Sequence, residues 1–132
     1  MKGTGVVRLR KVNTLELVRR AKDYLAGYLL QSPQQPTRLS QTARALGASP
    51  SSLASAFRTV ERVSFYRYSL NLRLARAAAL LPASEDLARL ALDLGFASHS
   101  HFSTAFHRWA GLTPSAFRAE ATAEESGATA GP

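Results

Sequence analysis

The chain has 132 residues, 45% of them apolar, which is enough for one or two small domains with a modest core. It contains no cysteine, which excludes disulfides, thiol catalysis and cysteine-ligated zinc or iron–sulfur clusters. No apolar run approaches the roughly 18 residues that a membrane-spanning helix needs, so no membrane partner is expected.

The basic residues are concentrated before residue 83. Residues 1–82 contain 14 basic residues (Lys and Arg) and 3 acidic residues (Asp and Glu). Residues 83–132 contain 3 basic and 6 acidic residues, and the net charge of the whole chain is +8. A basic domain of this size is typical of proteins that bind a polyanion, most often nucleic acid. The alternative is an arginine-rich surface that only keeps the chain soluble, and charge alone does not decide between the two.

The first predicted helix follows an irregular start. Residues 1–12 show no clear period and are predicted to be a linker or a disordered N-terminus. Asn13 or Thr14 can cap a helix that runs to about Leu30. Its apolar stripe comprises Leu17, Val18, Ala21, Leu25, Tyr28 and Leu29. The two prolines within residues 31–36 then predict a loop.

A short helix, a turn and a second helix are predicted after that loop. Gly47 ends the first helix, and Ser49 followed by Pro50 is a strong signal for the start of the second. Apolar residues line one face of each: Leu39, Ala43 and Leu46 in the first, and Leu53, Ala56, Phe57 and Val60 in the second. Ser64 can then cap a long connecting helix from Phe65 to about Leu81, which Pro82 stops.

The same pattern appears a second time. Asp86 caps a short apolar helix, Gly95 ends it, and Ser98 caps a helix that ends at Gly111. The buried stripes comprise Leu87, Leu90, Ala91 and Leu94, and then Phe102, Ala105, Phe106 and Trp109. Two short helices joined by a tight turn form a helix-turn-helix unit. Thr113–Pro114 begins a last helix through about Glu120, and residues 121–132 are predicted to be a disordered tail.

The two helix-turn-helix patterns are copies of one unit. Residues Leu39, Ala43, Leu46 and Gly47 match the residues 48 positions later, which are Leu87, Ala91, Leu94 and Gly95. Residues Leu53, Phe57, Ser64 and Tyr68 match those 49 positions later, which are Phe102, Phe106, Thr113 and Phe117. One residue has therefore been gained in the second turn, and a duplication of this extent is hard to obtain by chance.

With both units in view, the chain resembles the AraC/XylS family of bacterial transcription regulators. The resemblance covers roughly Leu15 to Arg118, and its most specific part is the pattern GF-x-S-x-S-x-F-S-x-x-F-x-x-x-x-G-x-T-P-x-x-F-R of residues 95–118. It implies an all-α, seven-helix DNA-binding domain. The expected parts are a first helix-turn-helix lobe in residues 13–62, a connecting helix in residues 63–82 and a second lobe in residues 83–120.

The chain departs from the family pattern in two respects. The first unit ends in Arg62 where the family usually has glycine, and an arginine forced to positive φ costs about 1 kcal/mol relative to glycine. Most members also carry a sensor domain, which this sequence lacks, so we expect either a short stand-alone member or the C-terminal piece of a longer regulator. We therefore expect no small-molecule effector site here, and any dimerisation to use residues outside this sequence.

The faces opposite the buried stripes are the candidates for contacting bases. On the helical wheel these faces hold Ser51, Ser55, Arg58 and Thr59 in the first unit, and Ser100, Thr104, His107 and Arg108 in the second. Family members use these same positions in the major groove. Serine and threonine hydroxyls can both donate and accept hydrogen bonds, so they discriminate weakly between bases. Direct readout of the base sequence is therefore expected to be weak.

Phosphate contacts are expected to supply most of the affinity. The candidates are Arg44, Arg73 and Arg76, with the free amides of the helix N-termini at Ser49 and Ser98. Arg73 matches an arginine that the family keeps in the connecting helix to hold the DNA backbone. A solvated surface charge is an equally good interpretation of Arg44 and Arg76.

No enzymatic chemistry is predicted. The three histidines, His99, His101 and His107, have no carboxylate cluster beside them, so no metal site, catalytic residue or cofactor is expected. His101 is expected to be partly buried and Trp109 to belong to the core. The resemblance implies a cytoplasmic, nucleoid-associated protein with double-stranded DNA and RNA polymerase as partners. A non-specific nucleic-acid binder and a protein-interaction module remain as alternatives.

Overall fold

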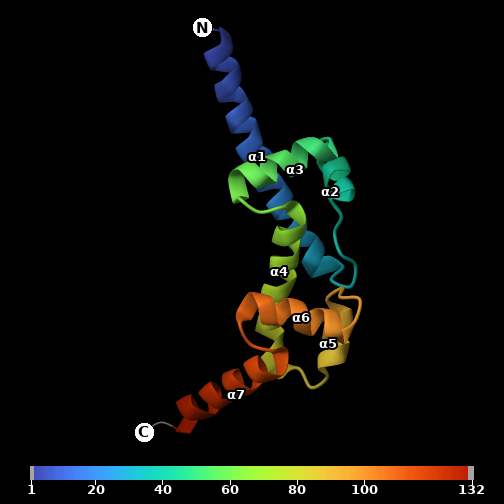
Figure 1. The fold of residues 1–132 in the computed structure, drawn as a ribbon, viewed down its shortest axis with the longest axis vertical. Coiled ribbons are helices and arrows are strands. Elements are labelled where there is room, and N and C mark those ends of the chain that lie inside the picture. The colour runs from blue at the N-terminus through green and yellow to red at the C-terminus, as the bar shows by residue number, and fades with distance from the viewer. Residues whose placement is uncertain (1, 131–132) are drawn as a thin grey trace. The chain divides into compact units, whose positions relative to one another are not determined.

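The computed structural model describes the backbone of residues 2–130 and the side chains of residues 13–124. Within this part the chain forms seven α-helices, one 3₁₀ turn and no strand (Figure 1), which confirms the all-α prediction. The elements are α1 (Lys2–Gln31), α2 (Leu39–Leu46), α3 (Pro50–Glu61), α4 (Phe65–Leu80), η1 (Leu81–Ala83), α5 (Leu87–Asp93), α6 (His99–Ala110) and α7 (Pro114–Ala130).

The first and last helices are longer than the sequence predicted. Helix α1 begins at Lys2 and not at Asn13 or Thr14, and α7 continues past Glu120 to Ala130. Residues 2–12 and 121–130 contain no proline, which would have interrupted a helix. The linker predicted in residues 1–12 and the disordered tail in residues 121–132 fall largely on residues whose side chains lie outside the described part, and both stay predictions.

Five predicted helix caps are present. Each capping side chain accepts a hydrogen bond from the backbone amide three residues later, at distances between 3.0 and 3.2 Å. The caps are Ser49, Ser64, Asp86, Ser98 and Thr113. These bonds satisfy amides that have no partner within the helix, so each helix starts at a residue that its own sequence specifies.

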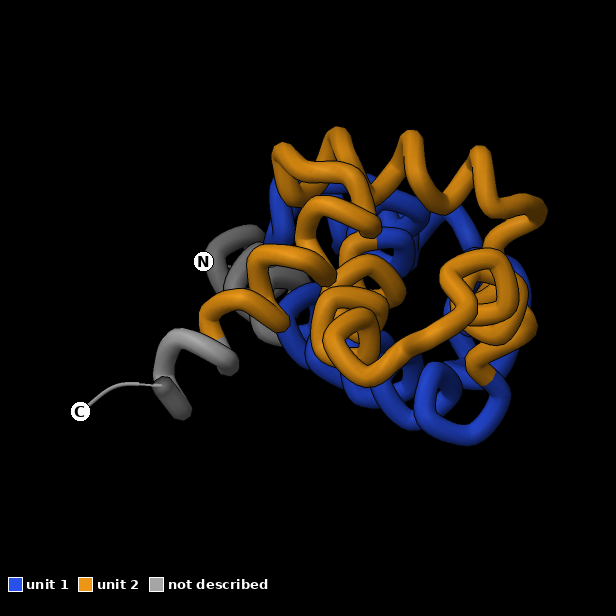
Figure 2. Tube along the Cα trace, turned by 90° about the horizontal axis from the view of Figure 1, so that it is seen from below, with its two compact units in different colours: residues 1–32, 37–70 blue, residues 33–36, 71–132 orange. Residues whose placement is uncertain are grey.

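The chain divides into two compact units (Figure 2). Unit 1 comprises residues 1–32 and 37–70, and unit 2 comprises residues 33–36 and 71–132. The division falls within α4, between Leu70 and Asn71, so each unit includes part of the long connecting helix. The loop at residues 33–36, between α1 and α2 in the sequence, belongs to unit 2.

The core of unit 1 is centred on Phe57 of α3. Phe57 is fully buried, and its ring makes edge contacts with Phe65 at 5.3 Å and with Tyr68 at 5.4 Å. Lys22 of α1 connects to the end of α3 through an ion pair with Glu61, with 2.6 Å between Nζ and Oε1. The hydrogen bond that Lys22 donates to the Glu61 carboxylate raises the pKa of Lys22, so the ammonium form is favoured in the folded state.

The core of unit 2 is a series of aromatic rings. Phe96, Phe102 and Phe106 are buried, with ring centroids 5.0 Å and 5.7 Å apart along the series, and Phe117 of α7 lies 5.4 Å from Phe106. The prediction that Trp109 is a core residue was wrong, because its side chain is 40% exposed, although its ring contacts that of Phe106.

Arg62 lies in the left-handed backbone region that glycine favours. It ends α3 with φ 63° and is the only described residue other than glycine at positive φ. Replacing Arg62 with glycine should raise the free energy of unfolding of unit 1 by about 1 kcal/mol, because glycine meets no Cβ penalty there. Urea unfolding measures the change. Arg62→Ala is the control, since it removes the charge but keeps the Cβ; an equal gain from alanine would contradict the backbone explanation.

Candidate nucleic-acid interface

Helix α3 has a buried face and a hydroxyl-rich exposed face. Its buried residues Leu53, Ala56 and Phe57 point into unit 1. The four predicted base-facing residues of this helix, Ser51, Ser55, Arg58 and Thr59, are all exposed. Ser49 fixes the start of the helix, because its Oγ accepts a hydrogen bond from the amide of Ser52 at 3.2 Å.

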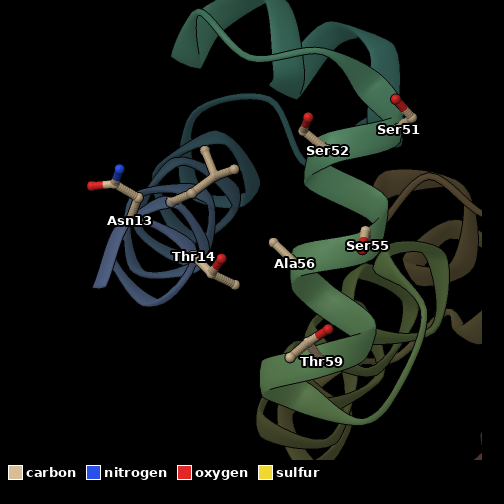
Figure 3. A pocket seen from close by; sticks show the side chains of 8 residues that line it. Asn13, Thr14, Ser51, Ser52, Ser55, Ala56 and Thr59 are labelled. Atoms are coloured by element: carbon tan, nitrogen blue, oxygen red, sulfur yellow. The ribbon is translucent and has the colours of Figure 1, made fainter. Parts of the chain in front are cut away.

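An open groove of about 640 Å³ lies beside this exposed face (Figure 3). It is lined by Asn13, Thr14 and Leu17 of α1 and by Ser51, Ser52, Ser55, Ala56 and Thr59 of α3. From the sequence, Asn13 or Thr14 was predicted to cap a helix. Their position beside α3 was not predicted. No signal within either segment joins them, because they are far apart in the sequence and meet only through the packing of α1 on α3.

Helix α6 repeats the arrangement in unit 2. Phe102 and Phe106 are fully buried, whereas Ser100, Thr104, His107 and Arg108 are all exposed. His101 is also exposed, so the prediction that it is partly buried was wrong; its ring only touches the edge of Phe96, at 5.7 Å. Ser98 caps the helix by accepting from the amide of His101 at 3.0 Å.

The predicted phosphate-contacting residues differ in exposure. Arg44 is exposed on α2, where it lines a smaller groove of about 330 Å³ with Ser40, Gln41 and Ala45, and Arg76 is exposed on α4. Arg73 is only 7% exposed. Its Nη1 donates to the carbonyl oxygen of Gly95 at 3.4 Å, and its guanidinium carbon lies 5.1 Å from the centroid of the Phe96 ring.

The chemistry of both exposed faces is that of hydrogen bonding and charge. Hydroxyl groups donate and accept, and the arginines carry a permanent positive charge that suits phosphates and guanine. Among the described residues there is no group of three His, Cys, Asp or Glu side chains that could hold a metal ion. Across the same part of the chain, no helix has the length and apolar character needed to span a membrane.

Comparison with known proteins agrees with this geometry. A family model described as a helix-turn-helix domain matches residues 42–120. Comparison with the curated proteins gives no match.

Three solved structures illustrate the likeness of this fold to known proteins. An AraC-type transcriptional regulator from Chromobacterium violaceum is 24% identical, with TM-score 0.74 over 83% of this chain and 95% of that one. The C-terminal domain of the response regulator AraT from Geobacillus stearothermophilus is 28% identical, with TM-score 0.69 over 79% and 84%. The DNA-binding domain of AdpA, solved with a target DNA, is 21% identical, with TM-score 0.68 over 77% and 93%. The family model, the duplicated unit and these likenesses together show that the chain belongs to the AraC/XylS family of helix-turn-helix transcription regulators and is a DNA-binding domain of that family.

Proposed function

We propose that the chain binds DNA sequence-specifically by inserting α3 and α6 into two successive segments of the major groove. The observation that carries this proposal is the exposure of all eight predicted base-facing side chains, on the sides of α3 and α6 opposite their buried stripes. One chain then does what a two-fold dimer of single helix-turn-helix proteins does, with groove segments about 34 Å apart.

Base contacts in this scheme are made by hydroxyls, His107 and two arginines. Arg58 and Arg108 are the strongest potential readers, because a guanidinium can donate twice to guanine. Ser51, Ser55, Thr59, Ser100 and Thr104 contribute single, water-bridged or methyl contacts. Joining two weak readers in one chain makes the second contact intramolecular, which compensates for shallow contacts in each unit.

Phosphate contacts supply the larger part of the affinity in the proposal. Arg44 and Arg76 provide exposed charges, and the amides at the N-termini of α3 and α6, next to Ser49 and Ser98, provide donors for phosphate oxygens. The target-DNA complex of AdpA supports DNA as the ligand of this fold. Bound in this way, the chain would act beside RNA polymerase as an activator or a repressor, in the cytoplasm of a bacterial cell.

Electrophoretic mobility shifts in increasing salt test the phosphate contribution. If about 6 phosphates are neutralised, log K is expected to fall with log salt at a slope near −5. Each assay includes unlabelled competitor, either selected operator DNA or random DNA of the same length. Operator should compete far better than random DNA. Equal competition would favour a non-specific nucleic-acid binder, and absence of any shift would favour a protein-interaction module. A slope near zero would contradict the role of phosphates.

A further inference from the structure

The connecting helix carries two arginines in different environments. Arg73 is 7% exposed, whereas Arg76, one turn later on α4, is exposed to solvent. A phosphate contact needs a guanidinium that reaches the protein surface. The side chain of Arg76 meets that requirement, and the side chain of Arg73 is instead enclosed within unit 2.

Arg73 contacts the turn that joins α5 to α6. Its Nη1 donates to the Gly95 carbonyl oxygen at 3.4 Å, and its guanidinium lies over the Phe96 ring at 5.1 Å. A cation over an aromatic face is attracted by the ring quadrupole, and more strongly when both groups are shielded from water. Burying a charged group is costly unless such partners compensate, so the position of Arg73 is tied to that of the turn.

The turn also contacts the buried face of α6. Phe96 is 2% exposed, its amide donates to the carbonyl oxygen of Ala91 at 3.0 Å, and its ring lies 5.0 Å from Phe102 on the buried face of α6. Gly95 takes φ 85° directly before it. Arg73, Phe96 and Phe102 therefore form a continuous set of contacts from α4 to the recognition helix of unit 2.

We infer that Arg73 is a positioning residue that holds the α5–α6 turn, and through it α6, in the orientation that reads DNA, and that it does not contact phosphate. This inference rests on the proposed function of α6 as a recognition helix. It replaces the phosphate contact that the family resemblance implied for Arg73. Arg76 keeps the phosphate role on the same helix and provides a matched comparison.

The first test compares two DNAs, an operator obtained by selection and the same operator with the half-element of α6 scrambled. Arg76→Met should weaken binding to both by the same factor, because phosphates carry no sequence information. Arg73→Met and Arg73→Lys should lower the ratio of the affinity for the operator to the affinity for the scrambled DNA by about tenfold, the loss typical of a mismatched base pair. The affinity for the scrambled DNA itself should stay nearly constant.

Arg73→Lys separates positioning from charge. Lysine binds phosphate well as a point charge, so a phosphate contact would be restored by this variant. It lacks the planar guanidinium that lies over Phe96 and donates to Gly95, so the affinity ratio should stay low. The inference would be overturned if the Arg73 variants weakened binding to both DNAs by the same factor. It would also be overturned if Arg73→Lys restored the wild-type affinities. A variant that only lowers the folded fraction of the protein would also weaken binding to both DNAs by the same factor. That result would overturn the inference as well.

Amide hydrogen exchange of the free protein provides the second test and needs no DNA. In both Arg73 variants the Phe96 amide should exchange at least about tenfold faster, whereas the Leu53 amide of unit 1 should keep its rate. An unchanged Phe96 rate, or equal acceleration of all unit 2 amides, would overturn the inference. If the wild-type chain showed no preference between the two DNAs, the proposed function would fail, while the exchange rates would still decide the role of Arg73.

Discussion

Replacing Phe106 with alanine is expected to lower the free energy of unfolding of unit 2 by about 3–5 kcal/mol, the usual cost of emptying a buried phenylalanine site. Phe106 is fully buried, and its ring contacts those of Phe102, Trp109 and Phe117 at 5.7, 5.6 and 5.4 Å. The free energy of unfolding of a small domain is only about 5–15 kcal/mol, so this loss would remove a large part of the stability of unit 2. Because α6 carries the base-facing residues of unit 2, their DNA contacts should be lost with it.

Urea denaturation measures this loss with a built-in reporter. Trp109 is the only tryptophan of the chain and lies in unit 2, so its fluorescence follows that unit. Leu92→Ala is the matched control, because Leu92 is 53% exposed in the same unit and its truncation should cost no more than about 0.5 kcal/mol. Similar midpoints for Phe106→Ala and Leu92→Ala would show that Phe106 is not part of the core.

The second large effect is expected at Gly95. This glycine has φ 85°, and a Cβ added to it would lie 3.1 Å from the carbonyl oxygens of Pro33 and Gln34. Gly95→Ala combines the cost of a left-handed alanine, about 1–2 kcal/mol, with crowding against the backbone of Pro33 and Gln34, which must shift by a few tenths of an ångström. We expect a total loss of about 2–4 kcal/mol in the free energy of unfolding of unit 2.

Gly111 provides the control for Gly95. It has φ 81°, but a Cβ placed on it would meet no atom within 4 Å. Gly111→Ala should therefore show the backbone cost alone, about 1–2 kcal/mol, in the same fluorescence-monitored urea unfolding. The difference between the two variants isolates the contact of the turn with residues 33–36. Equal losses would mean that this contact is loose enough to accept a methyl group.

Local signals in the sequence were sufficient to predict the order of the helices along the chain. Caps such as Ser98 and Asp86 act on amides three residues away, and the apolar stripes repeat within a single helix. The repeat also aligns Arg62 with Gly111, and both residues have the left-handed conformation in the structure. These features depend only on neighbouring residues, which is why the sequence predicts them.

Features that depend on packing between distant segments could not be predicted. The burial of Arg73 depends on Phe96, and the place of Asn13 beside α3 depends on how α1 packs. Trp109 has the correct spacing for a core residue, yet its side chain is 40% exposed. The start of α1 at Lys2 lacks any signal, because Asn13 and Thr14 are tolerated inside a helix as well as at its cap.

The claim that α3 and α6 each read DNA is tested most directly by in-vitro selection of bound sequences from a random duplex pool. We predict an enriched motif with two half-elements whose centres are about 10 base pairs apart, one turn of the duplex. In a parallel selection, Thr104→Ala should relax one half-element and leave the other unchanged. A pool that remains random, or a motif with a single element, would contradict reading by two helices.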